Sequence, residues 1–125
     1  MLDFEGSDGV VADLTEREKL EAQWLTLTRQ TLPALAKPRR WPVSADHCFM
    51  RILLDAVHQG RWDKVVQGRP AYKHIDAGRL VAAIKLAERV VADEVDLWAL
   101  NVRSLTWRGK KIINHQGRSM EPIFG

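Results

Sequence analysis

The clearest helical pattern in the chain is Asp46-His47-Cys48-Phe49-Met50-Arg51-Ile52-Leu53-Leu54-Asp55-Ala56-Val57-His58. Its apolar residues recur at intervals of three and four, the spacing that gathers side chains on one face of an α-helix. They are Phe49, Ile52, Leu53, Ala56 and Val57. Ser44 is suited to cap this helix at its start and Gly60 to end it. We therefore expect an amphipathic helix here, with its apolar face in the core.

A second helix is predicted N-terminal to this one. Thr15 and Glu18 have the spacing of a capping box, in which each side chain accepts a hydrogen bond from the backbone N–H of the other residue. Apolar residues follow at roughly helical intervals. Pro33 should kink or interrupt this helix, because its ring clashes with the preceding turn.

Two more helices are predicted in the second half of the chain. Asp76 can cap the first of them, and a break near Asp93 leads into the last, which Gly109 ends. Residues 61–75 are expected to form a loop with a short helical turn. Convincing strand-like alternation is absent, so the sequence predicts an all-α fold, a small irregular four-helix single domain.

A chain of 125 residues fits one domain with one core. We expect a flexible acidic N-terminus over residues 1–12, a helical domain over 13–110 and a basic C-terminal tail over 111–125. Cys48 is the lone cysteine and cannot form an internal disulfide. The sequence has no signal-peptide pattern and no apolar run long enough to span a membrane, so a cytoplasmic location without membrane contact is expected.

Charge is distributed unevenly along the chain. Residues 1–22 hold seven acidic side chains against two basic ones, whereas residues 23–125 hold seventeen basic against nine acidic. This asymmetry suggests an anionic partner for the body of the protein, or an acidic N-terminal segment that folds back on it. The alternative is an ordinary solvated surface, since the net charge of +3 is modest.

One polar stripe offers candidate catalytic residues. His47, Arg51, Asp55 and His58 lie on one face of the predicted 46–58 helix, opposite Phe49. A histidine beside an aspartate can transfer protons, and an arginine can hold an anion. The alternative is a solvated face with ordinary side-chain pairs. Metal-binding and phosphate-loop motifs are absent from the sequence, so neither a metal nor a cofactor is expected.

Cations and aromatic rings are neighbours at several positions, for example in Arg61-Trp62, Tyr72-Lys73 and Trp107-Arg108. Nucleic-acid surfaces combine the two in this way, although arginine stems also commonly cover the rings that close a core. Nucleic acid is therefore a candidate partner that the pattern does not favour, because no basic recognition helix can be singled out.

Three segments resemble a small helical family of uncharacterised bacterial proteins. They are residues 46–55 (DHCFMRILLD), 68–73 (GRPAYK) and 100–110 (LNVRSLTWRGK). Members of that family sometimes carry the label of a GNAT-type N-acetyltransferase. Such enzymes bind acetyl-CoA through an Arg/Gln-x-x-Gly-x-Gly/Ala turn between a strand and a helix, and this sequence has neither the turn nor the strands.

If the three segments meet in space, they would form one cationic pocket with aromatic walls. Its lining would be His47, Arg51, Asp55, Arg69, Tyr72, Lys73, Trp107 and Arg108. Such a pocket suits a small anion, a nucleotide or an acidic peptide. The leading hypothesis is thus a binding or adaptor domain for an anionic small molecule or protein partner, and a homodimer formed through the tail is compatible with it. The alternatives are a small enzyme, for instance a transferase, that uses His47, Asp55 and His58, or a subunit of a larger assembly.

Overall fold

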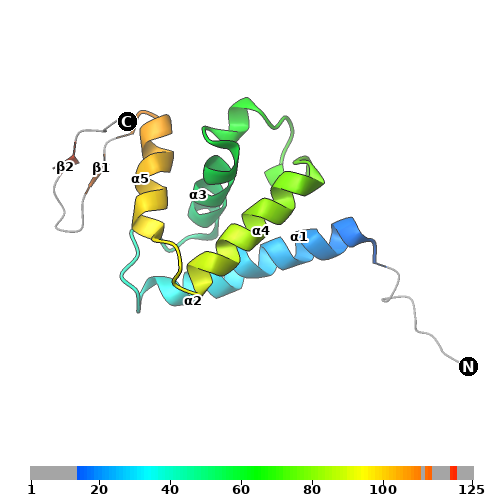
Figure 1. Ribbon diagram of the computed structural model, residues 1–125, viewed down its shortest axis with the longest axis horizontal. Coiled ribbons are helices and arrows are strands. Elements are labelled where there is room, and N and C mark those ends of the chain that lie inside the picture. Colours follow the sequence, from blue (N-terminus) through cyan, green and yellow to red (C-terminus); the bar gives the residue numbers. More distant parts are fainter. Residues whose placement is uncertain (1–13, 111, 114–118, 121–125) are drawn as a thin grey trace, which may run out of the picture.

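The structure is a computed structural model that describes residues 14–110, 112–113 and 119–120 (Figure 1). It has four helical rods, which confirms the prediction of an all-α single domain. The first rod comprises α1 (Glu16–Thr26), the π-helical turn η2 (Leu27–Thr31) and α2 (Leu32–Ala36). The others are α3 (Asp46–His58), α4 (Ala77–Val91) and α5 (Leu97–Trp107). The predicted acidic segment 1–12 lies outside the described residues.

Short elements fill the connections. The loop between α3 and α4 contains two 3₁₀ turns, η3 (Trp62–Lys64) and η4 (Ala71–Lys73). Beyond α5, two-residue strands pair antiparallel, with Ile112 opposite Met120. The sequence did not predict this pair, because two residues are too few for alternation to register.

Pro33 interrupts the α-helical hydrogen bonding of the first rod but does not end the rod. The backbone N–H of Leu32 donates to the carbonyl of Leu27, five residues back. This wider π turn comes just before the proline, which has no N–H to donate and would clash with the carbonyl four residues earlier. Pro33 then occupies the first turn of α2, where a missing N–H costs little.

The core lies between the first rod, α3 and α4, with α5 against α3 (Figure 1). Trp24, Phe49 and Leu80 are completely buried there. Of the predicted apolar stripe on α3, the first three residues are in the core, and Ala56 and Val57 pack partly buried against it. Among the described residues, every helix is too short or too polar to cross a membrane.

The helix ends differ from the predictions at α3. The N-cap is Ala45, which makes no side-chain cap hydrogen bond, and the backbone N–H of His47 is satisfied instead by Asp46 Oδ1 at 2.7 Å. Gln59 takes the left-handed conformation (φ 56°) at the C-terminus in place of Gly60. The predicted capping box at Thr15 is present.

The predicted caps of the last two helices are also tested by the structure. Asp76 accepts from the backbone N–H of Arg79 and so caps α4 as predicted. The break after α4 includes Asp93 (φ 62°), and Asp96 is the residue that caps α5. The guanidinium of Arg39 donates to the last carbonyls of α4, those of Val90 and Val91, at 3.0 and 2.8 Å.

Candidate ligand-binding site

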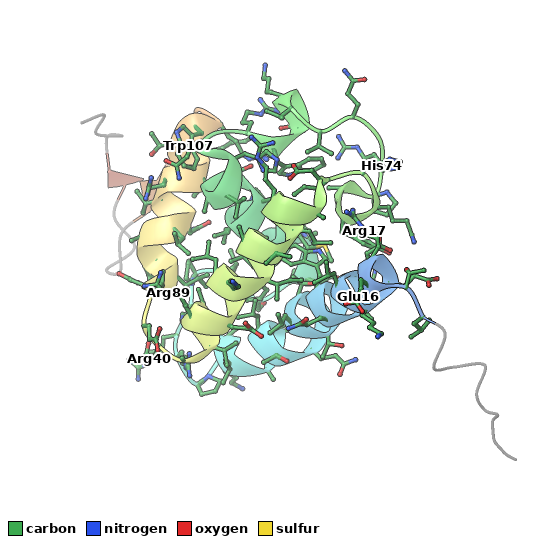
Figure 2. All side chains as sticks on the ribbon, turned by 45° about the vertical axis from the view of Figure 1, so that its right-hand side comes forward. Glu16, Arg17, Arg40, His74, Arg89 and Trp107 are labelled. Carbon is green, nitrogen blue, oxygen red and sulfur yellow. The ribbon has the colours of Figure 1, made fainter. Side chains whose placement is uncertain are left out.

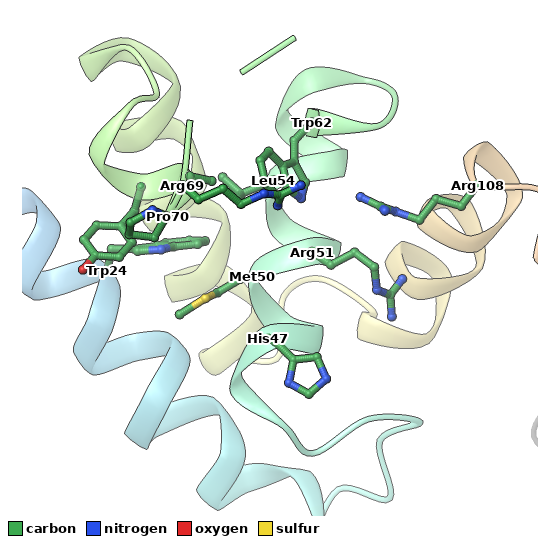
Figure 3. A pocket seen from close by; sticks show the side chains of 11 residues that line it. Trp24, His47, Met50, Arg51, Leu54, Trp62, Arg69, Pro70 and Arg108 are labelled. Atoms are coloured by element: carbon green, nitrogen blue, oxygen red, sulfur yellow. The ribbon is translucent and has the colours of Figure 1, made fainter. Parts of the chain in front are cut away.

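A cavity of about 560 Å³ opens between α1, α3, the η3–η4 loop and the end of α5 (Figure 3). Eleven residues line it: Trp24, His47, Met50, Arg51, Leu54, Trp62, Arg69, Pro70, Ala71, Tyr72 and Arg108. The volume lies within the range of small-molecule sites in proteins. Basic and apolar side chains make up this lining, and no carboxylate belongs to it.

The buried part of the cavity lining is apolar apart from Trp24 Nε1, which has no hydrogen-bond partner among the described residues. Trp24, Leu54 and Ala71 are all buried and form what we call the floor. Met50 and Tyr72 are partly buried and pack beside it. A methionine next to two rings makes a surface that adapts to the shape of an apolar ligand.

Arg51 reaches the cavity from α3 and is held only by neutral groups. Its Nη1 donates to Ser104 Oγ at 2.7 Å and its Nη2 donates to Asn101 Oδ1 at 2.9 Å. Among the described residues, no carboxylate lies within ion-pair distance of it. A guanidinium has five N–H donors, so three remain for a bound anion. The side chain is therefore fixed in direction, and no carboxylate of the described residues is in direct contact with it.

Arg108 lies at the end of α5, and its positive charge is neutralised by the carboxylate of Asp55. Asp55 is completely buried and accepts from Arg108 Nε and Nη2 at 2.8 and 2.9 Å. The same carboxylate accepts from Ser104 Oγ at 2.6 Å and from the backbone N–H of Trp62 at 3.0 Å. Asp55 thus joins α3, α5 and η3 behind the cavity, and Ser104 connects it to Arg51.

Arg69 covers the cavity from the loop side. Its guanidinium carbon lies 4.9 Å from the centre of the Trp62 ring, a cation–π contact (Figure 3). As with Arg51, the described residues place no carboxylate within ion-pair distance of it. The backbone before it is fixed by Gly68, whose φ is +103° and which packs directly on the ring of His74. The backbone conformation at Gly68 therefore helps to direct Arg69 over Trp62.

Asp63 stabilises η3, the turn that carries Trp62. Its carboxylate accepts from Arg61 Nε and Nη2 at 3.1 and 2.7 Å, and Arg108 Nη2 lies 3.7 Å away. The hydrogen bonds from Arg61 are the main cause that lowers the pKa of Asp63 below its ordinary value. The acid therefore stays charged and keeps the turn closed at the cavity wall.

The candidate catalytic residues do not form a proton-transfer pair. His47 lines the cavity but its side chain is 81% exposed, and Nδ1 lies 3.6 Å from Asp46. His58 Nδ1 lies 2.7 Å from the carbonyl of Leu54, so this nitrogen carries the proton, and Nε2 is buried without a partner among the described residues. Neither histidine is a hydrogen-bond partner of Asp55, whose oxygens are occupied by Arg108, Ser104 and Trp62.

The structure brings five of the eight predicted lining residues to one cavity. These are His47, Arg51, Arg69, Tyr72 and Arg108. The other three lie elsewhere. Asp55 sits behind Arg108, Lys73 Nζ is 3.4 Å from Glu21, and Trp107 stacks under Arg103 at 5.4 Å.

The sequence indicated Tyr72 but not the rest of the apolar part of the site. Trp24, Met50 and Leu54 belong to it, and helical spacing does not show whether such residues face another helix or a cavity. Trp62 carried a signal, since it follows Arg61 in one of the basic–aromatic pairs. Its contact with Arg69 depends on how the loop folds and cannot be read from spacing.

Comparison of the chain with known protein families, with curated proteins and with solved structures found no match. Among the described residues, no group of three His, Cys, Asp or Glu side chains lies close enough to hold a metal ion.

Proposed function

We propose that this protein is a binding domain for an organic anion, with the ligand's apolar body on the floor of the cavity and its negative group against Arg51 and Arg69. The observation that carries the proposal is the position of Arg51. It is oriented by Ser104 and Asn101, lines an apolar cavity and has no carboxylate partner among the described residues. The two hydrogen bonds join α3 to α5 and leave further guanidinium N–H donors, from which an incoming carboxylate, sulfonate or phosphate can accept.

The shape of the site favours a small molecule over a nucleic-acid strand. Nucleic-acid grooves track a backbone with many phosphate contacts, whereas this cavity combines an apolar floor with two guanidiniums that no carboxylate of the described residues contacts directly. A small enzyme using His47 is the second hypothesis. It has less support, because the buried carboxylate that would orient a histidine is already bound by Arg108.

A pair of fluorescent probes tests the proposal. 1-Anilinonaphthalene-8-sulfonate combines an aromatic body with a sulfonate, and N-phenyl-1-naphthylamine has the same rings without the charge. We expect the sulfonate probe to bind more tightly, with an affinity that falls as ionic strength rises. Equal binding of both probes would remove the anionic group from the proposal.

Substitutions then locate the probe. Arg51→Met keeps the apolar stem and should weaken the sulfonate probe about tenfold, the lower range for a hydrogen bond to a charged group, while it leaves the neutral probe unchanged. Arg51→Lys, which keeps the charge, should lose less. Arg79→Met is the matched control, because Arg79 is an exposed arginine of α4 outside the cavity. An equal loss in the control would mean that the probe responds to net charge alone.

A further inference from the structure

Two acids contact the α5 side of the cavity wall, and each already has an arginine partner. Asp55 accepts from Arg108 at 2.8 and 2.9 Å, and Asp63 accepts from Arg61 at 3.1 and 2.7 Å. The negative charges of these two acids are therefore matched by the positive charges of the two arginines. Of the three guanidiniums that line the cavity, only Arg108 is paired in this way among the described residues.

On the side of α1 the acid is Glu21, and it has two cations. Its carboxylate accepts from Arg17 Nε at 2.8 Å and from Lys73 Nζ at 3.4 Å, and the hydrogen bond from Arg17 is the main cause that lowers its pKa. Arg17 also donates to the carbonyl of Tyr72, and Figure 2 shows Arg17 beside the loop that carries His74. Glu21 therefore neutralises these cations and not the guanidiniums of the cavity.

Arg51 and Arg69 are the charges left in excess. The remaining acid next to a lining residue, Asp46, precedes His47 and lies 3.9 Å from Arg29. The lining guanidiniums and their ion-pair partners are four arginines and two aspartates, with a net charge of +2: Arg51, Arg61, Arg69, Arg108, Asp55 and Asp63. A ligand with two negative charges would neutralise this set.

The two excess charges belong to different walls of the cavity. Arg51 is held by Ser104 and Asn101 of α5, whereas Arg69 lies over the ring of Trp62 in the loop. In Figure 3, Arg51 extends toward α5 and Arg69 lies beside Trp62, in a separate part of the cavity. Each guanidinium is thus placed to receive an acidic group of its own.

We propose that the ligand of this cavity is a dianion with two separated acidic groups, one at Arg51 and one at Arg69, joined by an apolar body that lies on the floor. This inference rests on the proposed function, because it concerns the same cavity, and it narrows organic anions to dicarboxylates and their analogues. Each carboxylate accepts from guanidinium N–H donors. A phosphate monoester also has two negative charges but places both at one point, so it serves as the alternative in the test.

Ligands that share one ring system test the separation. Naphthalene-2,6-dicarboxylate and naphthalene-2,7-dicarboxylate have their carboxylates on different rings. Naphthalene-2,3-dicarboxylate, the matched control, has the same charge with both groups on one ring, and 2-naphthoate has a single group. Isothermal titration calorimetry with the full chain at neutral pH and low ionic strength gives their dissociation constants. We expect the tighter of the two separated isomers to bind about tenfold more tightly than the 2,3 isomer and 2-naphthoate, the lower range for one further hydrogen bond to a charged group.

Arg51→Met and Arg69→Met should each remove this preference. Either variant keeps one of the two guanidiniums, so the separated dicarboxylate should bind at most about twofold more tightly than 2-naphthoate, because salt screens the second carboxylate from distant charges. Arg79→Met should keep the tenfold preference, since Arg79 is an exposed arginine of α4 outside the cavity. The two ligands are compared within one variant, so a change in folding stability affects both and cancels.

Four outcomes would contradict the inference. Equal binding of the separated isomers and the 2,3 isomer would show that total charge determines the affinity. Tighter binding of 2-naphthyl phosphate than of any dicarboxylate would place both charges at one point. If 2-naphthoate binds as tightly as the dicarboxylates and still depends on Arg51, the second acidic group is refuted and the binding function stands. If neither the naphthalene anions nor 1-anilinonaphthalene-8-sulfonate bind, the proposed function is refuted as well.

Discussion

Asp55 and Arg108 form a two-point ion pair, with Arg108 Nε and Nη2 donating to the two carboxylate oxygens at 2.8 and 2.9 Å. The aspartate side chain is completely buried and the arginine side chain is 15% exposed. Because the pair links α3 to the end of α5, it fixes the wall on which Arg108 and Arg51 are placed. Asp55 therefore has a structural role: it holds the cavity wall in position.

Removal of Asp55 should be strongly destabilising. Asp55→Ala leaves Arg108, Ser104 and the backbone N–H of Trp62 without their shared acceptor. Breaking a buried ion pair by deleting one partner costs about 3–5 kcal/mol. Urea denaturation should show a loss of that order in the free energy of unfolding. A loss below about 1 kcal/mol, the typical value for an exposed pair, would mean that the pair contributes little.

The backbone at Gly68 should be necessary for the position of Arg69. A Cβ at this residue would lie 2.8 Å from the His74 ring, and the φ of +103° already disfavours any side chain. Gly68→Ala should lower the free energy of unfolding by about 1–3 kcal/mol and weaken binding of the sulfonate probe. Gly60→Ala is the control, because a Cβ there meets nothing within 4 Å. If both variants behave alike in denaturation and binding, the loop geometry does not position Arg69.

The cap that Arg39 provides to α4 should contribute to stability. Its guanidinium donates to the carbonyls of Val90 and Val91 at the end of α4, and the Val90 carbonyl also accepts from the backbone N–H of Asp93 at 3.0 Å. Arg39→Met keeps the stem and should cost about 1–2 kcal/mol in the free energy of unfolding. Lys37→Met, at an exposed residue of the same connector, should cost less than about 0.5 kcal/mol. Equal losses in thermal or urea unfolding would argue against a capping role.

Asp63 should contribute to stability in a pH-dependent way. The hydrogen bonds from Arg61 lower its pKa in the folded state, so its contribution is fully present above the unfolded pKa of about 3.9 and is lost as the pH falls through the lower folded value. Asp63→Asn should therefore be less stable than the unaltered protein at pH 7, and the difference should shrink below about pH 3. Denaturation at both pH values checks this, and a difference that persists in acid would contradict it.

The sequence predicted the helices better than the site. Apolar spacing and a capping box located the 46–58 helix and the start at Thr15, because both signals depend only on residues within one or two turns. Ser44 and Gly60 were each wrong by one residue as caps. Ala45 is the N-cap, with Asp46 accepting from the backbone N–H of His47, and Gln59 takes the left-handed conformation at the C-terminus. Helix ends depend on such single hydrogen bonds, which composition does not determine.

The charged residues of the cavity were predicted better than its apolar and aromatic residues, of which Tyr72 alone was named. Arg51, Arg69 and Arg108 drew attention because cations stand out in a sequence, and the structure does bring them together. Trp24 did not, because a tryptophan on a helical stripe looks the same whether it faces another helix or a cavity. Lys73 and Trp107 have the expected chemistry but point elsewhere, toward Glu21 and Arg103. The direction in which each of these side chains points depends on packing between segments that are distant in the sequence. The spacing of residues along the chain therefore does not predict it.

The π turn ahead of Pro33 determines the rotational phase of the whole first rod. Trp24, Thr28, Leu32 and Ala36 follow one another at intervals of four and are all buried. An uninterrupted α-helix advances by about 100° per residue, so positions four apart drift steadily around its axis. The wider turn takes up that drift. Deletion of one residue from this turn would therefore rotate α2 about the rod axis relative to α1. Leu32 and Ala36 would then leave the side of the rod on which Trp24 lies and would no longer face the other three helices.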